Sequence, residues 1–296
     1  MFSRIMRDPG AIAGLMIMLI VIVTALLAPA LAPHNPEPVN LGQKLLPPES
    51  GFPLGTDALG RCLYSRILFG ARVTLQYSFS ILIVIMAIGV PFGLLAGYRG
   101  GFTDTIIMRI VDTILAFPNL ILALVLVGLL GPGLFNVMLA LALVSWVGYA
   151  RIVRGMVLSI KEKEYIAAAK ICGTKSASLI IRHILPNVLP PLVVLATLDL
   201  GKLVLSIATL SFLGLGAQPP TPEWGAMIND ARPYLQTVPR LMIAPGAAIA
   251  LTVLGFNMLG DGLRDILDPR MAAGNGHNKK YLAWLLPGGG KAGDSR

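Results

Sequence analysis

The chain has few of the residues that usually bind metals or perform catalysis. Its 296 residues include two cysteines and three histidines, and neither an HExxH nor a CxxC pattern occurs. Such patterns supply the ligands of structural zinc and of metalloprotease zinc. We therefore expect no metal site and no catalytic residues on this chain.

A phosphate-binding loop is also missing. The nearest approach is the Gly288–Lys291 segment, but its glycine spacing is wrong and Ala292 stands where the loop needs Ser or Thr. We expect no ATP and no other cofactor to bind this chain.

Charged residues are scarce as well, at 13%, against 55% hydrophobic residues and a mean hydropathy of +0.75. Several apolar windows of about 20 residues are long enough to cross a bilayer as helices. The sequence thus predicts an all-α membrane protein with six transmembrane helices. Their approximate positions are 11–32, 73–98, 105–130, 134–158, 187–213 and 240–262.

The excess of basic over acidic residues, a net charge of +9, reflects membrane orientation better than nucleic-acid binding. With six spans, seventeen of the 24 Lys and Arg residues fall on the side of the two termini and six on the other. Lys and Arg are enriched in cytoplasmic loops, so we expect both termini in the cytoplasm and no nucleic-acid partner. Cys62 would then lie outside, open to impermeant thiol reagents, and Cys172 inside, so the two could not form a disulfide.

This topology divides the chain into a transmembrane domain, residues 1–270, and a flexible cytoplasmic tail, residues 271–296. Within the domain, residues 33–72 form an external segment and residues 161–186 a cytoplasmic loop. In the external segment, Asp57 and Arg61 are spaced to pair on one helical face. Trp224 is expected on a short external helix at the membrane interface.

Residues 161–190, KEKEYIAAAKICGTKSASLIIRHILPNVLP, are polar and basic between long apolar spans. They predict a helix of small side chains, a turn at Gly173 and a second helix that stops at Pro186. Such a loop can dock a soluble cytoplasmic partner, and the alternative is that it lies on the bilayer.

Asp199 and Lys202 are the ionisable exceptions inside the fifth span. Three residues apart on a helix, they can neutralise each other, which is the simpler interpretation. The alternative is that they line a transport pathway, because ionisable residues within membrane spans are functional candidates.

Residues 167–186, AAAKICGTKSASLIIRHILP, resemble the Glu-Ala-Ala (EAA) loop of permease subunits of bacterial ABC importers. Aligned on Gly173, Ala168, Ala169, Leu185 and Pro186 match, whereas Ala167 replaces the glutamate and His183 an isoleucine. Further motifs resemble the C-type permeases for dipeptides, oligopeptides and nickel. They are LGTDALGR, in which Cys62 follows in place of an acidic residue, then GYRGGFTD, MRIVDTILAFP, SFLGLGAQPPTPEWGAMI and FNMLGDGLRDILDP.

The resemblance implies the type I ABC importer permease fold, with six spans, a cytoplasmic coupling helix and a location in the bacterial inner membrane. It implies as partners a second homologous permease, two cytoplasmic ATPase subunits that hydrolyse the ATP, and an extracytoplasmic substrate-binding protein. The coupling-loop residues would be Ala167, Ala168, Ala169, Lys170, Gly173, Arg182, Leu185 and Pro186.

We expect nickel or a metal chelate as the substrate, with dipeptides or oligopeptides as the alternative. A proton-coupled secondary transporter would require deep acidic pairs and inverted repeats, and only Asp199 is present. A membrane-embedded enzyme would require a cluster of reactive side chains that the sequence lacks.

Overall fold

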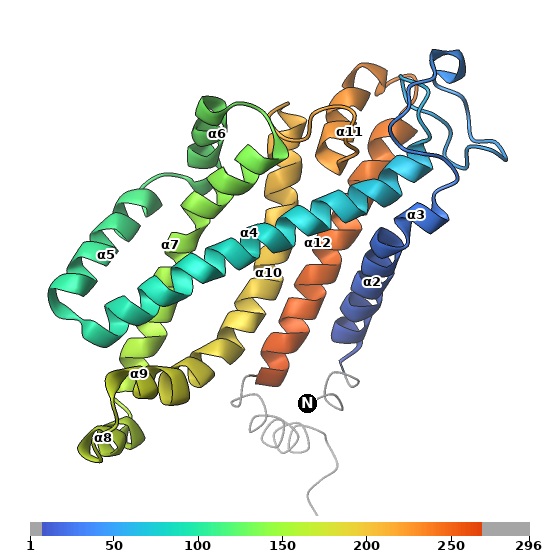
Figure 1. Ribbon diagram of the computed structural model, residues 1–296. Helices are drawn as coiled ribbons and strands as arrows, with labels where there is room; N and C mark the ends of the chain where they lie inside the picture. The colour runs from blue at the N-terminus through green and yellow to red at the C-terminus, as the bar shows by residue number, and fades with distance from the viewer. Residues whose placement is uncertain (1–7, 268–296) are drawn as a thin grey trace, which may run out of the picture.

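The computed structural model describes residues 8–267, and helices account for most of them (Figure 1). The helices are α2 (Pro9–Leu26), α3 (Ala28–Leu31), η1 (Leu41–Gln43), α4 (Leu63–Arg99), α5 (Gly101–Leu115), α6 (Asn119–Leu130), α7 (Leu134–Lys161), α8 (Glu164–Ile171), α9 (Ser176–Leu179), η2 (Ile180–Ile184), α10 (Leu185–Phe212), α11 (Trp224–Ala231), η3 (Arg232–Tyr234) and α12 (Arg240–Leu267). The expected tail, residues 271–296, lies outside the described residues.

Five of the six expected spans are continuous helices long and apolar enough to cross a membrane. The third is not continuous, because α5 and α6 are bent by 86° relative to each other. Pro118, just before α6, explains the break, since a proline lacks an N–H and disfavours helical geometry at the preceding residue, Phe117. Residues 8–267 therefore contain five helices that could span a membrane, or six spans if this bent pair counts as one.

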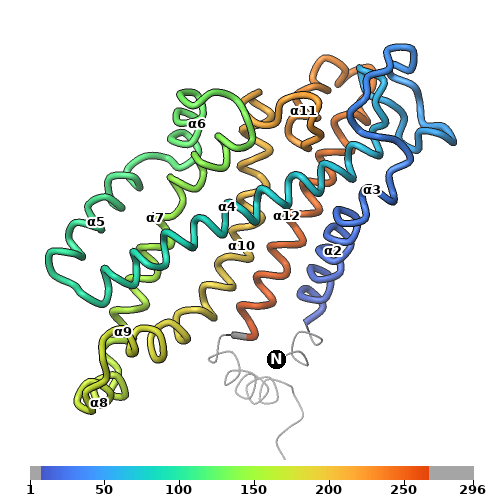
Figure 2. Tube along the Cα trace, in the orientation of Figure 1, coloured from blue at the N-terminus to red at the C-terminus, as the bar shows by residue number. Residues whose placement is uncertain are grey.

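The helices alternate in direction along the bundle (Figure 2). The beginning of α2, the end of α12 and the α7–α9 connection lie toward one end, while α3, α6 and α11 lie toward the other. Close packing joins α2 to α12, because a Cβ added at Gly14 would lie 2.6 Å from the amide nitrogen of Leu259. Both ends of the described chain thus share one end of the bundle with α8.

Gly89, Gly93 and Gly97 lie one helical turn apart on α4 and face α7. A Cβ added at Gly89 or Gly93 would meet a backbone carbonyl oxygen of α7 at 2.7 or 2.6 Å, and one at Gly97 would lie 2.7 Å from the Cβ of Val157. Glycine permits this approach because it has no side chain, as in other small-residue packing of membrane helices. The strip therefore fixes α4 against α7.

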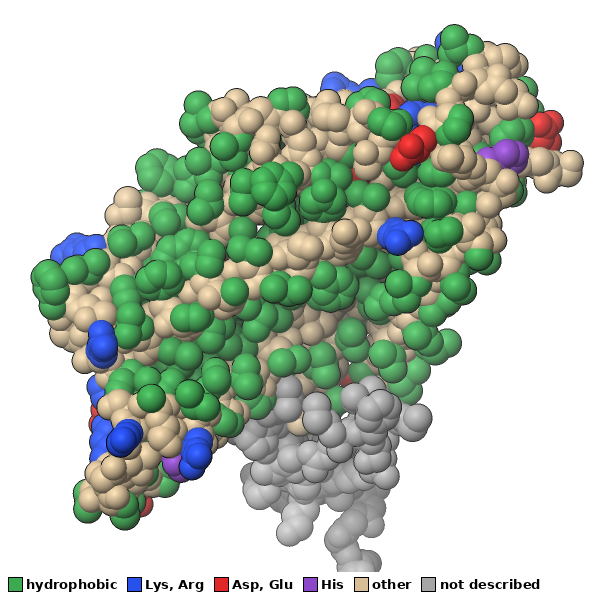
Figure 3. All heavy atoms as spheres, viewed as in Figure 1, with side chains coloured by type: hydrophobic (Ala, Val, Ile, Leu, Met, Phe, Trp, Pro, Cys, Tyr) green, Lys and Arg blue, Asp and Glu red, His purple; other side chains and the backbone are tan. Residues whose placement is uncertain are grey.

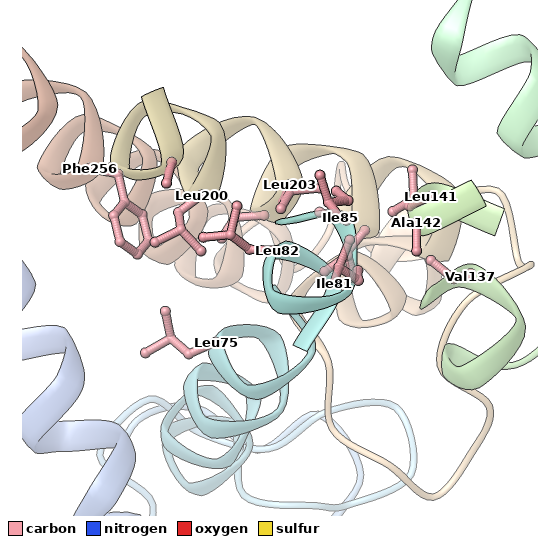
Figure 4. Close-up of a cluster of buried hydrophobic side chains, with 14 of the residues drawn as sticks. Leu75, Ile81, Leu82, Ile85, Val137, Leu141, Ala142, Leu200, Leu203 and Phe256 are labelled. Atoms are coloured by element: carbon pink, nitrogen blue, oxygen red, sulfur yellow. The ribbon is translucent and has the colours of Figure 1, made fainter. Parts of the chain in front are cut away.

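The core lies where α4, α7, α10 and α12 meet. Figure 4 shows Ile85 of α4 beside Leu203 of α10, and Leu82 of α4 beside Leu200 of α10, with Phe256 of α12 next to Leu200. The outer surface is also largely hydrophobic (Figure 3), as expected of helices that face lipid. Lys and Arg side chains gather near α8 and the adjoining end of α5.

Candidate functional site

Helix α8 projects from one end of the bundle (Figure 1). Ile166 is fully buried and anchors it to the core, whereas Ala167, Ala168 and Lys170 are exposed. Ile171, the last residue of α8, is 87% exposed, which is unusual for a large apolar side chain. The helix thus presents small and apolar side chains at a surface that residues 8–267 leave uncovered.

The turn predicted at Gly173 is present. Gly173 has a φ of +76°, a left-handed conformation that favours glycine. Its amide donates to the carbonyl of Lys170, and the amide of Thr174 donates to that of Ala169. These bonds satisfy carbonyls at the end of α8 and reverse the chain.

The expectation that Pro186 stops the second helix is wrong. Residues Ser176–Phe212 form one membrane-length helical run, with Pro186 in the first turn of α10. The run widens to a π-helix at Ile180–Ile184, where the amide of Leu185 donates to the carbonyl of Ile180. Pro186 lacks the N–H that an α-helix would direct to Arg182, so this local widening accommodates the proline without ending the helix.

Asp199 and Lys202 form the ion pair that their spacing predicts, with Nζ of Lys202 2.8 Å from Oδ1 of Asp199. Both side chains line a cavity of ≈ 270 Å³ between α10, α7 and the start of α6. Asn119, Ser145 and Tyr149 contribute polar groups to the same cavity. Lys202 is 73% exposed and Asp199 22%.

Four charged side chains cluster at the opposite end of the bundle. Nε of Arg61 lies 2.7 Å from Oδ2 of Asp57, Nε of Arg66 lies 3.5 Å from the same oxygen, and Arg61 also reaches Asp230 of α11 at 3.5 Å. The two arginines are almost completely buried, at 3% and 2% exposure. Arg66 also donates to the carbonyl of Pro36, so the cluster joins the external segment to α4 and α11.

The predicted Asp57–Arg61 pair therefore exists, but not on a helix, since α4 begins only at Leu63. Neither Arg66 nor Asp230 was predicted from the sequence as part of a charged cluster. The sequence around Arg66 is compatible with a helix but does not indicate that its side chain is buried. Asp230 is far from Asp57 and Arg61 in the sequence. The final ten residues of the expected external segment, 63–72, belong to α4.

The expectation that the Trp224 side chain lies at the membrane interface is also wrong, because the side chain is buried within the protein. It is 2% exposed, and its Nε1 donates to the carbonyl of Ile67 on α4. Glu223 beside it is fully buried and accepts from the amides of Gly225 and Ala226, capping α11. Burial raises the pKa of the Glu223 carboxyl, although these amide bonds act in the opposite direction.

Cys62 is also buried, at 2% exposure, whereas Cys172 is exposed. The expectation that Cys62 reacts with impermeant reagents is therefore wrong. Its side chain is enclosed where the external segment meets the start of α4.

These features define a polytopic membrane protein with a projecting helix at one end, a charged cluster at the other and a polar cavity between its spans. Residues 89–273 match the family described as binding-protein-dependent transport system inner membrane component, and residues 1–48 match the N-terminal TM domain of oligopeptide transport permease C. The chain belongs to this family of ABC importer permeases.

Curated relatives carry several substrate names. The chain is 44% identical to the dipeptide transport system permease protein DppC of Alkalihalophilus pseudofirmus, over 91% of this chain and 89% of that protein. It is 44% identical to the glutathione permease GsiD of Pectobacterium atrosepticum, over 91% and 90%, and 41% identical to the nickel permease NikC of Escherichia coli K12, over 89% and 95%. The expected preference for nickel thus gains no specific support.

The fold also occurs among solved structures. An inward-facing structure of the MetNI methionine ABC transporter matches 70% of this chain and 98% of its own chain, with a TM-score of 0.57 and 21% identity. At this identity the match concerns the fold alone. It agrees with the all-α class predicted from the sequence.

Proposed function

We propose that this chain forms half of the translocation pathway of an ATP-driven importer of small peptides. The observation that carries the proposal is the 44% identity to a dipeptide permease over 91% of the chain. Glutathione is itself a tripeptide, so the relative named for it supports the same substrate class. Nickel or a nickel chelate is the second candidate, favoured by the 41% identical nickel permease.

The proposed assembly contains a second permease, two ATPase subunits and an extracytoplasmic binding protein. The docking surface for one ATPase is α8 with the turn at Gly173, because Ala168 and Ile171 are exposed there while Ile166 holds the helix to the core. Closure of the ATPases would move this loop, and the continuous helix Ser176–Phe212 would carry the movement into the membrane. ATP hydrolysis would occur on the partner subunits.

The proposed orientation places α8 and both termini in the cytoplasm of the bacterial inner membrane. Five basic residues lie in or beside the α8 loop, namely Lys161, Lys163, Lys170, Lys175 and Arg182. This enrichment agrees with the tendency of basic residues to remain on the cytoplasmic side. The cluster around Arg61 and Arg66 would then face the binding protein.

Uptake into proteoliposomes tests the proposal. The two permeases should be reconstituted with and without the ATPases, and binding protein loaded with radiolabelled dialanine added outside. We expect uptake that requires both ATP and the ATPases and that excess unlabelled dialanine abolishes. Uptake driven by a proton gradient without the ATPases, or transport of nickel–histidine with no transport of dialanine, would contradict it.

A further inference from the structure

The ion pair on α10 occupies a position where neither charge suits lipid. Lys202 is 73% exposed within a membrane-length helix, and a lysine at the centre of a span is costly to insert into lipid. Such residues face a water-filled cavity or another subunit rather than lipid. In the proposed assembly, this face of α10 would line the space between the two permeases.

The neighbouring helix offers polar groups to the same space. Tyr149 of α7 is only 3% exposed and lines the cavity. Its hydroxyl lies beside the Asp199 carboxylate but makes no hydrogen bond of normal geometry within residues 8–267. A buried hydroxyl without a well-formed hydrogen bond favours the binding of a ligand or water. Asn119 and Ser145 complete the polar wall, joined by a hydrogen bond of 3.3 Å.

The Asp199–Lys202 ion pair differs from an ion pair that holds two helices together. Asp104 and Arg154 bridge two helices with two bonds and are largely covered, at 18% and 31% exposure. Asp199 and Lys202 both belong to α10, so their ion pair does not bridge two helices, and the Tyr149 hydroxyl of α7 lies beside Asp199. Their mutual neutralisation is therefore an arrangement that an incoming ion of each sign can replace.

We propose that this cavity recognises the two charged ends of a free peptide during its passage. The peptide ammonium group would pair with Asp199, and the peptide carboxylate would pair with Lys202. The hydroxyl of Tyr149 would form a hydrogen bond with the peptide backbone. Recognition of the termini suits a pathway that must accept many side chains, because every unmodified peptide carries both charges. The inference rests on the proposed function, and it identifies the two charged termini as the feature of the peptide that the pathway recognises.

A protection experiment tests the inference without the binding protein. A cysteine placed by Ser206→Cys lies on the cavity wall one turn from Lys202, and Cys172→Ser removes the exposed native thiol. The permease–ATPase complex is incubated with dialanine and then with a water-soluble maleimide. At about ten times its Kd, dialanine should slow labelling of the new cysteine about tenfold, because about a tenth of the sites stay free.

Two controls make the result specific. N-acetyl-dialanine amide has the same backbone without the charges and should not protect. In the Asp199→Asn/Lys202→Met background, which removes both charges while nearly preserving the size of both side chains, dialanine should not protect either. Failure of this double variant to assemble would show a structural pair and overturn the inference, as would equal protection by the uncharged peptide.

The outcome is separable from that of the proposed function. If the wild-type complex imports dialanine but dialanine does not protect the cysteine, the inference is wrong and the proposed function stands. If the wild-type complex imports no dialanine, the proposed function fails and the inference falls with it.

Discussion

Replacing Ala168 by aspartate is expected to release the ATPase subunits while leaving the permease folded. Ala168 is exposed on α8, so the change disturbs no internal contact, but it places a charge where a partner should cover the helix. An unpaired buried charge that costs about 3 kcal/mol would weaken binding about a hundredfold. Co-purification of the ATPases with the permeases, followed by ATP-driven uptake, measures the loss.

Ala167→Glu is the matched control for this change. The new side chain is also acidic and lies one position away, yet a glutamate occupies this position in the motif that the loop resembles. We expect normal ATPase binding in Ala167→Glu. If both variants retain the ATPases, or if both lose them together with folding, α8 is not the docking surface.

Replacing Asp57 by asparagine is expected to destabilise the external end strongly. Arg61 and Arg66 are 3% and 2% exposed and share the Asp57 carboxylate, so the change leaves two buried positive charges with too little compensation. Breaking a buried ion pair in this way costs about 3–5 kcal/mol. Thermal unfolding of the purified permease pair, followed by intrinsic fluorescence, should show a marked fall in Tm.

Asp112→Asn is the control for the cluster. Asp112 pairs with Arg151, but both side chains are half exposed, at 58% and 50%. Exposed ion pairs contribute about 0–1 kcal/mol, so little change in Tm is expected. Equal shifts in the two variants would show that the burial of the cluster has no energetic consequence.

The sequence was sufficient for features that depend on local spacing. The apolar windows predict the spans, Gly173 predicts the turn after α8, and the interval between Asp199 and Lys202 predicts their ion pair. Each follows from helix geometry or backbone freedom over a few residues.

The remaining features depend on contacts between distant segments. Trp224 donates a hydrogen bond to the carbonyl of Ile67, 157 residues away, so the burial of its side chain cannot be predicted from the residues around it in the sequence. Asp230 joins Arg61 only because α11 folds back onto the start of α4. The polar cavity could not be predicted from any single segment either, because it forms where Tyr149 of α7 lies beside Asp199 of α10.

The effects of two prolines were predicted wrongly from the sequence, in opposite ways. Pro118 interrupts a window that reads as one span, whereas Pro186 does not stop the helix it was expected to end. The difference lies in the neighbouring backbone, because Ile180–Ile184 widens into a π-helix that tolerates the missing N–H.

Cross-linking from Cys172 tests the central claim that this permease couples to an ATPase through α8. Cys172 follows α8 directly and is exposed, while Cys62 is buried, so a benzophenone maleimide should attach to Cys172 alone. Illumination of the assembled transporter should yield a covalent adduct of the permease with an ATPase subunit, and Ala168→Asp should abolish that adduct. Cross-links to lipid or to the second permease, with none to an ATPase in the wild-type complex, would contradict the account.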